Sequence, residues 1–284
     1  MRMKRILISL LVIGIFFSLS LNTVNAQSDS ATISKRLHHI KESASIIIDS
    51  LKLQTIKEYF TTIDPDDSEY VYLYVSSKDS VSRISPGRFY FYDTDPQRGR
   101  QKADSFSRIG YDIMLYLTAG TSGAMIHKHL FTFDDISNSF IMLHEAMHIH
   151  IGRAGFRHIT YDYEESIGDV VGNAYLTKLF PKSEHRACKR FIRCNERVYK
   201  KINKCLAGKL SKESCQKKIY RITNNIGSSF QKERYQYTVN NAYLLRFQDY
   251  TLHYFELKKK FKKFKTLQES LISCFGKPYT PVKK

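Results

Sequence analysis

The first half of the chain carries three short runs of aromatic and β-branched residues. Such runs, bounded by turn residues, are typical of strands. They lie at 70–75 (YVYLYV), 88–92 (RFYFY) and 111–117 (YDIMLYL). Helices are expected beside them at about 33–60 and 95–109. The pattern therefore predicts a small mixed sheet with helices packed against it.

From about residue 134 the apolar positions take the spacing of a helix. The apolar stripe consists of Ile136, Phe140, Leu143, Met147 and Ile151. Intervals of four, three, four and four keep these residues on one helical face. A second helix is expected at about 163–179. Mostly long helices follow from 184, one of them with an apolar stripe from Tyr254 to Leu271. Strands followed by a helical half make the expected fold class α+β.

The N-terminus has the pattern of a signal peptide. Arg2, Lys4 and Arg5 precede an apolar run at 6–21, and Val24-Asn25-Ala26 has the small-residue spacing of a cleavage site. We therefore expect an exported protein, periplasmic or secreted, that is cleaved near Ala26. No stable membrane anchor is expected after this cleavage.

Positive charge is concentrated in the last third of the chain. Residues 1–181 hold 19 basic and 20 acidic side chains (net −1), and residues 182–284 hold 26 and 7 (net +19), which together give +18. Such a segment can bind polyanions or a membrane surface, or its charges can simply solvate the outer faces of helices. No nucleic-acid partner is expected. The predicted organisation is a signal peptide at 1–26, a catalytic half at 27–181 and a basic, Cys-containing helical half at 182–284.

All five cysteines lie in the basic third. In an exported protein their expected use is disulfide formation. Cys205 and Cys215 flank a predicted turn between two helices and are the favoured pair. Cys188 with Cys194 is a weaker alternative, which leaves Cys274 unpaired. A C-x-x-C spacing is absent from the sequence, which argues against a cysteine metal site.

The segment His144-Glu145-Ala146-Met147-His148 lies inside the helix predicted to begin at about residue 134. Residues four apart share a helical face, so both imidazoles can reach one ion while Glu145 approaches a water molecule as general base. This H-E-x-x-H signature predicts one Zn²⁺ per chain, bound by His144 and His148. Glycine-rich phosphate loops and the G-x-S-x-G motif are absent, which disfavours nucleotide-dependent and serine-hydrolase chemistry.

A catalytic zinc ion needs a third protein ligand. The H-x-x-G-x-x-H extension is absent; His150 is expected to point away from the ligand face, and His158 has no supporting pattern. Glu165 is the candidate, with Glu164 as its rival because only one of two adjacent carboxylates can face inward. Asp169, four residues after Glu165, is expected to accept a hydrogen bond from a ligating imidazole.

Further motifs follow the H-E-x-x-H segment in a fixed order. They are Tyr163-Glu164-Glu165-Ser166 and Asn240-Asn241-Ala242-Tyr243-Leu244 with Tyr250 beyond, and upstream of them Gly110-Tyr111-Asp112 and a small-residue loop at 118–121. Over roughly 90–271 the combination resembles the predicted aminopeptidase family of bacterial zincins. The resemblance implies a zincin-like core of the gluzincin type, one zinc ion, Glu165 as third ligand and hydrolysis of peptide bonds.

The expected partner is therefore a peptide or protein substrate. Glu145 is the expected general base, and Tyr237, followed by Asn241, is the candidate to stabilise the oxyanion. The strand at 111–117 can pair with an extended peptide or belong to the core alone. No residue of the sequence is a candidate to hold a free α-amine, so exopeptidase and endopeptidase activity both stay open. The alternatives are an inactive scaffold that binds polyanions and a zinc hydrolase of non-peptide amides or esters.

Overall fold

A computed structural model describes residues 30–51, 69–85, 89–92, 95–119, 126, 128–156, 159–263 and 266–276. The chain divides into two compact units, Met1–His38 and His39–Lys284, and the second holds the features discussed below. The predicted signal peptide and positions 120–121 of the predicted small-residue loop lie outside the described residues. Among the described residues no helix is long and apolar enough to cross a membrane.

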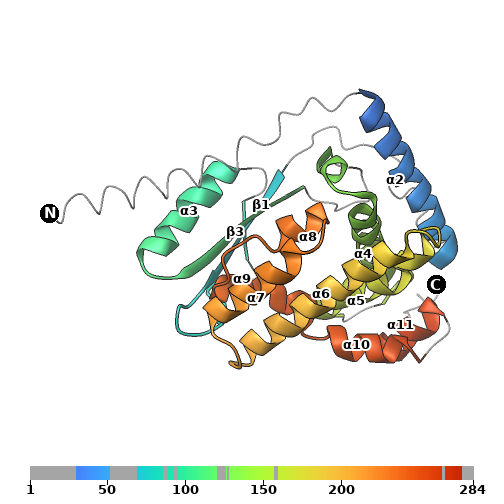
Figure 1. The fold of residues 1–284 in the computed structure, drawn as a ribbon. Helices are drawn as coiled ribbons and strands as arrows, with labels where there is room; N and C mark the ends of the chain where they lie inside the picture. Colours follow the sequence, from blue (N-terminus) through green and yellow to red (C-terminus); the bar gives the residue numbers. More distant parts are fainter. Residues whose placement is uncertain are drawn as a thin grey trace, which may run out of the picture. The chain divides into compact units, whose positions relative to one another are not determined.

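The described elements confirm the α+β class, with many helices and one small sheet (Figure 1). In chain order they are α2 (Ser30–Leu51), β1 (Glu69–Ser76), β2 (Tyr90–Phe91), α3 (Pro96–Arg108), β3 (Asp112–Ala119), η2 (Lys128–Thr132), α4 (Asp135–Ala154), α5 (Tyr161–Tyr175), η3 (Leu176–Lys178), α6 (His185–Leu206), α7 (Lys212–Asn224), α8 (Ser229–Arg234), α9 (Asn241–Thr251), α10 (Tyr254–Phe261) and α11 (Leu267–Phe275).

The described strands form an antiparallel sheet in the order β2-β1-β3, so the prediction of a mixed sheet is wrong. The reason is the crossover by α3, which carries the chain from one edge of the sheet to the other. Both outer strands therefore run antiparallel to the central strand β1. Tyr72 of β1 lies opposite Tyr116 of β3.

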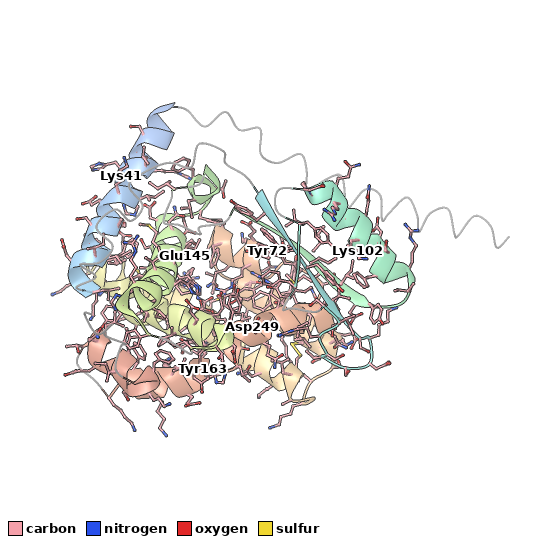
Figure 2. The ribbon with its side chains drawn as sticks, turned by 180° about the vertical axis from the view of Figure 1, so that it is seen from behind. Lys41, Tyr72, Lys102, Glu145, Tyr163 and Asp249 are labelled. Carbon is pink, nitrogen blue, oxygen red and sulfur yellow. A yellow bond between two sulfur atoms is a disulfide. The ribbon has the colours of Figure 1, made fainter. Side chains whose placement is uncertain are left out.

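The two faces of the sheet have different neighbours. Leu73 and Val75 of β1 form a core cluster with Ala103 of α3. The alternate residues of β1, including Tyr72 and Tyr74, point to the opposite face, against which α9 packs. Tyr72 lies on β1 between α3, which carries Lys102, and the helices that include α4 (Figure 2). The sheet therefore separates α3 from the remaining helices of this unit.

Two asparagines attach the start of α9 to the sheet. The Asn240 side chain accepts a hydrogen bond from the backbone of Tyr243 at 2.8 Å and donates one to the Ile113 carbonyl at 2.9 Å. The Asn241 side chain donates to the carbonyls of Ser77 and Lys78, at 2.8 and 2.9 Å. The Asn-Asn segment is therefore a structural clamp that fixes where the side chains of α9 lie.

The basic helix α6 turns one face toward the core. Its buried residues include Phe191, Val198 and Ile202, whereas Lys189, Arg193 and other basic side chains are exposed. This arrangement is that of helix faces solvated by charge. The continuous stripe predicted from Tyr254 to Leu271 is instead divided between α10 and α11, because Thr266 begins a new helix with a capping box to Glu269.

One disulfide connects α6 to α7. It joins Cys205 to Cys215, which confirms the favoured pair. Cys188 and Cys194 are both buried free thiols, so the weaker alternative is wrong. Six positions along one helix separate their backbones by about 9 Å, more than a disulfide spans. Cys274 is also free.

Candidate metal centre

Helix α4 carries the first two candidate ligands. It begins after Asp134, whose carboxylate accepts a hydrogen bond from the backbone of Ser137 at 2.8 Å. It ends at Gly155, whose φ of 77° is a left-handed conformation that glycine adopts without strain. Gly152 lies inside the helix. His144 and His148 are one turn apart and share a face.

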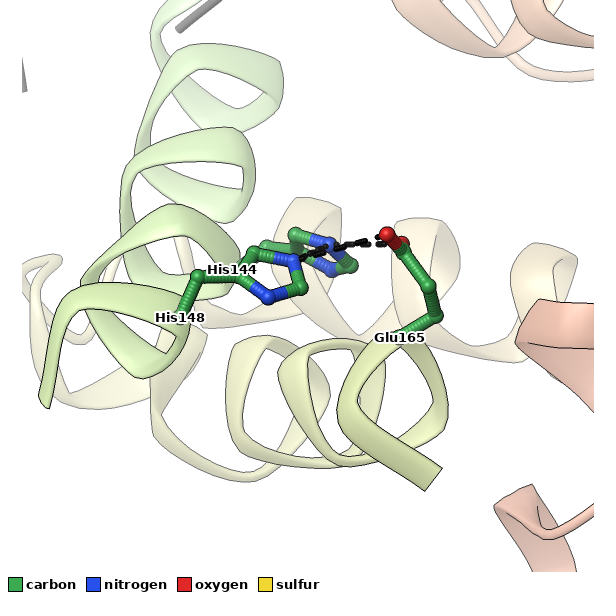
Figure 3. A group of neighbouring side chains, drawn as sticks. All are labelled: His144, His148 and Glu165. Carbon is green, nitrogen blue, oxygen red and sulfur yellow. Dashed lines mark hydrogen bonds and ion pairs between the residues drawn. The ribbon is translucent and has the colours of Figure 1, made fainter. Parts of the chain in front are cut away.

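Three electron-pair donors meet between α4 and α5 (Figure 3). The Nε2 atoms of His144 and His148 are 3.0 Å apart. The Glu165 carboxylate lies 3.2 Å from Nε2 of His144 and 3.7 Å from Nε2 of His148. Tetrahedral zinc with bonds of about 2.0–2.1 Å separates its ligand atoms by roughly 3.3 Å. The three separations are close to that value, and the two glutamate distances end at different carboxylate oxygens. A small shift of Glu165 would therefore let one zinc ion reach all three residues.

The outer nitrogen of each imidazole faces a carboxylate. His144 Nδ1 lies 2.8 Å from Asp169 Oδ1, and His148 Nδ1 lies 3.1 Å from Glu164 Oε1. An ionised carboxylate only accepts hydrogen bonds, so both Nδ1 atoms carry the proton. When both rings are neutral, their Nε2 lone pairs face the Glu165 carboxylate. Lone pairs and a carboxylate repel one another, so the cluster can take up either protons or a metal ion.

The adjacent carboxylates of α5 thus have separate partners. Glu165 is buried and faces the two Nε2 atoms, whereas Glu164 is partly exposed and orients His148. Glu165 is therefore the member of the pair in the ligand cluster. The Tyr161 hydroxyl donates a hydrogen bond to the Glu165 carboxylate, a partner that the sequence patterns did not indicate.

Asp169 is completely buried within a polar network. Its Oδ2 atom accepts hydrogen bonds from the Tyr199 hydroxyl and from Arg234 Nη2, the latter at 3.1 Å. Arg234 neutralises the carboxylate while the carboxylate orients His144. Tyr199 and Arg234 come from α6 and α8, so nothing in the local sequence around Asp169 revealed them.

The cluster attracts positive charge. Burial lowers the pKa of His144, but the hydrogen bonds and charges of Asp169 and Glu165 outweigh burial and raise that pKa to about 10. Burial also opposes charge on His148, yet Glu165 and Glu164 raise its pKa. Burial favours the neutral form of Glu165, whereas the two histidines hold its pKa well below the usual range. A metal ion and protons would compete for these groups.

A cavity opens beside the cluster. Its described lining includes His144, Glu145 and Asp169 together with Tyr116 and Tyr250. The ring of Tyr250 lies 6.0 Å from that of His144, between centroids. Glu145 therefore faces the same space as the first ligand, as a general base must.

The candidates for oxyanion stabilisation occupy other places. Tyr237 is not among the described residues that line the cavity, and its ring lies 6.2 Å from that of Tyr116, which does line it. Asn241 is the clamp residue described above. His150 is buried outside the donor cluster, and His158 lies outside the described residues. Tyr116 and Tyr250 are the tyrosines among the described lining residues, and the ring of Tyr250 lies beside that of His144.

Comparisons with models of protein families, with curated proteins and with solved structures find no match for this chain.

Proposed function

We propose that this chain is an exported zinc-dependent metallopeptidase. The observation that carries the proposal is the cluster of His144, His148 and Glu165, with a general base at position 145 facing the adjacent cavity. Two histidines and a glutamate are a ligand set of catalytic zinc, which leaves a position for water and substrate. Structural zinc sites, in contrast, are usually closed by four protein ligands.

Zinc in this site would supply Lewis-acid polarisation of the scissile carbonyl. The chain supplies the proton transfers and the orientation. Glu145 would take a proton from the attacking water and deliver it to the leaving amine. Asp169 and Glu164 keep each Nε2 lone pair directed inward by holding the proton on Nδ1. Tyr250 would donate a hydrogen bond to the oxyanion. Tyr237, the residue predicted from the sequence for this role, is the alternative.

The strand β3 is suited to an extended substrate. It lies at an edge of the described sheet, with β1 on its other side. An edge strand offers unpaired backbone groups to a peptide that adds as a further strand. This feature favours a peptide over a small amide or ester, which would gain nothing from such pairing.

Metal analysis of the mature protein tests the proposal first. We expect about one zinc ion per chain, retained in Glu145→Gln and lost in His148→Ala. His150→Ala is the matched control, because it removes an imidazole from the same helix outside the cluster. Sub-stoichiometric zinc that is unchanged in His148→Ala would contradict the metal centre.

Cleavage of a mixed peptide library, followed by mass spectrometry, tests the chemistry. Loss of the general base in Glu145→Gln should lower the cleavage rate by about 10²–10⁴-fold while zinc content stays unchanged. Cleavage that persists in the zinc-loaded Glu145→Gln variant would rule out this mechanism. Zinc-loaded wild-type protein that hydrolyses simple esters but no peptide would favour the non-peptide hydrolase instead.

A further inference from the structure

Besides Arg234, a second buried arginine lies in the wall of the same cavity. Arg246 of α9 is 6 % exposed and is among the cavity-lining residues. Its guanidinium carbon lies 3.6 Å from the ring centroid of Tyr116, and Nη1 donates to the Tyr74 hydroxyl at 3.4 Å. Its buried Nε has no hydrogen-bond partner among the described residues.

The other arginine of the cavity has a different environment. Arg234 is 3.1 Å from the Asp169 carboxylate, so its charge is neutralised within the protein. Arg246 forms no ion pair with any carboxylate of the described residues; aromatic rings surround it. A buried guanidinium without a carboxylate partner is costly, because the charge has lost its hydration. Stacking on tyrosine returns only part of that free energy.

Neighbouring side chains hold this arginine in place. The Asn240 and Asn241 clamp fixes the first turn of α9 on the sheet, and Tyr116 and Tyr74 hold the guanidinium from β3 and β1. A planar guanidinium with free donors matches the two oxygens of a carboxylate. Phe140, Phe230 and Ile141 make much of the remaining lining apolar.

We propose that Arg246 binds a carboxylate of the peptide substrate, so that the protein selects peptides with a free α-carboxylate next to a large apolar side chain. This inference rests on the proposed function and specifies its substrate. It favours hydrolysis near the C-terminal end of a chain over the removal of N-terminal residues. An Asp or Glu side chain of the substrate offers the same chemistry, and the experiment separates the two sources.

Thiol ligands test the proposal without a known substrate, because a thiolate binds zinc directly. The probes are mercaptoacetyl-phenylalanine and mercaptoacetyl-glycyl-phenylalanine, each as the free acid and as the carboxamide. Mercaptoacetyl-glutamate carboxamide presents a side-chain carboxylate alone. Calorimetric titration of each probe into the zinc-loaded full chain gives the ratio of acid to amide affinity.

We expect at least one free acid to bind about tenfold or more tightly than its carboxamide, as for a charge-assisted hydrogen bond. The ratio of acid to amide affinity should fall to near one in Arg246→Met. In Arg246→Lys, which keeps the charge without the planar donors, the ratio should lie between one and the wild-type value. Lys232→Met is the control, because it removes an exposed positive charge from α8. The ratio should not change in that variant.

The outcomes separate the two proposals. Equal binding of acid and carboxamide by the wild-type protein overturns the role of Arg246 and leaves the metallopeptidase proposal intact. A preference for the free acid that survives in Arg246→Met also overturns the role of Arg246 and leaves the metallopeptidase proposal intact. Tighter binding of the glutamate carboxamide than of both free acids assigns Arg246 to an acidic side chain and overturns the α-carboxylate. If no thiol binds the zinc-loaded protein, the metal is not reachable from the cavity and both proposals fail. The wild-type comparison decides the matter even if Arg246→Met does not fold.

Discussion

Gly168 of α5 lies directly under the ring of His144. A methyl group at this position would stand 2.7 Å from Nδ1 and 2.8 Å from Cε1 of that ring. Contacts between such atoms are optimal at about 3.5–4.0 Å, so Gly168→Ala requires a displacement of about 1 Å. The ring is the neighbour that must move, or else the two helices must separate. Either response disturbs the hydrogen bond from His144 Nδ1 to Asp169, now 2.8 Å long.

The variant sets two effects of opposite sign against each other. Alanine favours a helix interior over glycine by about 1 kcal/mol. Overpacking of a filled site costs about 1–3 kcal/mol, so the apo protein should be unchanged or destabilised by up to about 2 kcal/mol. A lengthened hydrogen bond to Asp169 weakens the support of the ligand, which should lower zinc affinity by about 10–100-fold.

Gly152 provides a matched control within α4. A methyl group there meets nothing within 4 Å, and the position is exposed and helical. Gly152→Ala should therefore stabilise the protein by about 0.5–1 kcal/mol and leave zinc affinity unchanged. Zinc affinity is measured by competition with a chromophoric chelator, and stability by urea unfolding of the apo protein. Wild-type zinc affinity in Gly168→Ala would refute the argument that this glycine makes room for a ligating imidazole.

Three further predictions concern the network, the disulfide and the cavity. Asp169→Asn should destabilise the apo protein by about 3–5 kcal/mol in urea unfolding, because it leaves a buried arginine without its counter-ion. Replacement of Cys205 and Cys215 by serine should lower the urea-derived stability by about 3 kcal/mol without changing zinc affinity, because the bond closes a loop and so restricts the unfolded chain. An unchanged stability would contradict this argument. Tyr250→Phe should lower kcat by about 10²-fold. Tyr237→Phe should have a smaller effect on kcat, and the reverse order would restore the residue predicted from the sequence.

Local periodicity explains what could be predicted from the sequence. His144 and His148 share a face because they are one helical turn apart, and the same spacing relates Glu165 to Asp169. These relations lie within single helices, so a pattern of polar and apolar positions is enough to find them. The strands could be predicted for a similar reason, because their runs of aromatic and β-branched residues are local patterns. The direction of the strands was not found, because it depends on the path of α3 across the sheet.

The remaining parts of the site come from tertiary packing. Tyr199, Arg234 and Arg246 reach the site from α6, α8 and α9, and their sequence neighbourhoods resemble those of ordinary helices. One readable signal was the Asn-Asn segment before α9, since an asparagine at a helix start is a frequent cap. Its second function, as a clamp on the sheet, required the fold. The sequence makes Asn241 the second candidate, after Tyr237, to stabilise the oxyanion, whereas in the structure its side chain donates to the carbonyls of Ser77 and Lys78.

Several residues of α5 are unfavourable for an isolated helix, and they lie on the side of α5 that packs against α4. Gly168 and Gly172 each weaken a helix interior, yet a methyl group at either would collide with His144 or with Phe140, at 2.7 Å in both cases. Asp169, between them, is a fully buried acid. A helix without such close neighbours would be more stable with alanine at these positions, and a buried position such as 169 is usually apolar. Residues that contradict local preference and converge on one set of donors indicate a site under functional constraint. The close approach of α4 and α5 thus fits the proposed metal centre, because that approach brings Glu165 to both imidazoles.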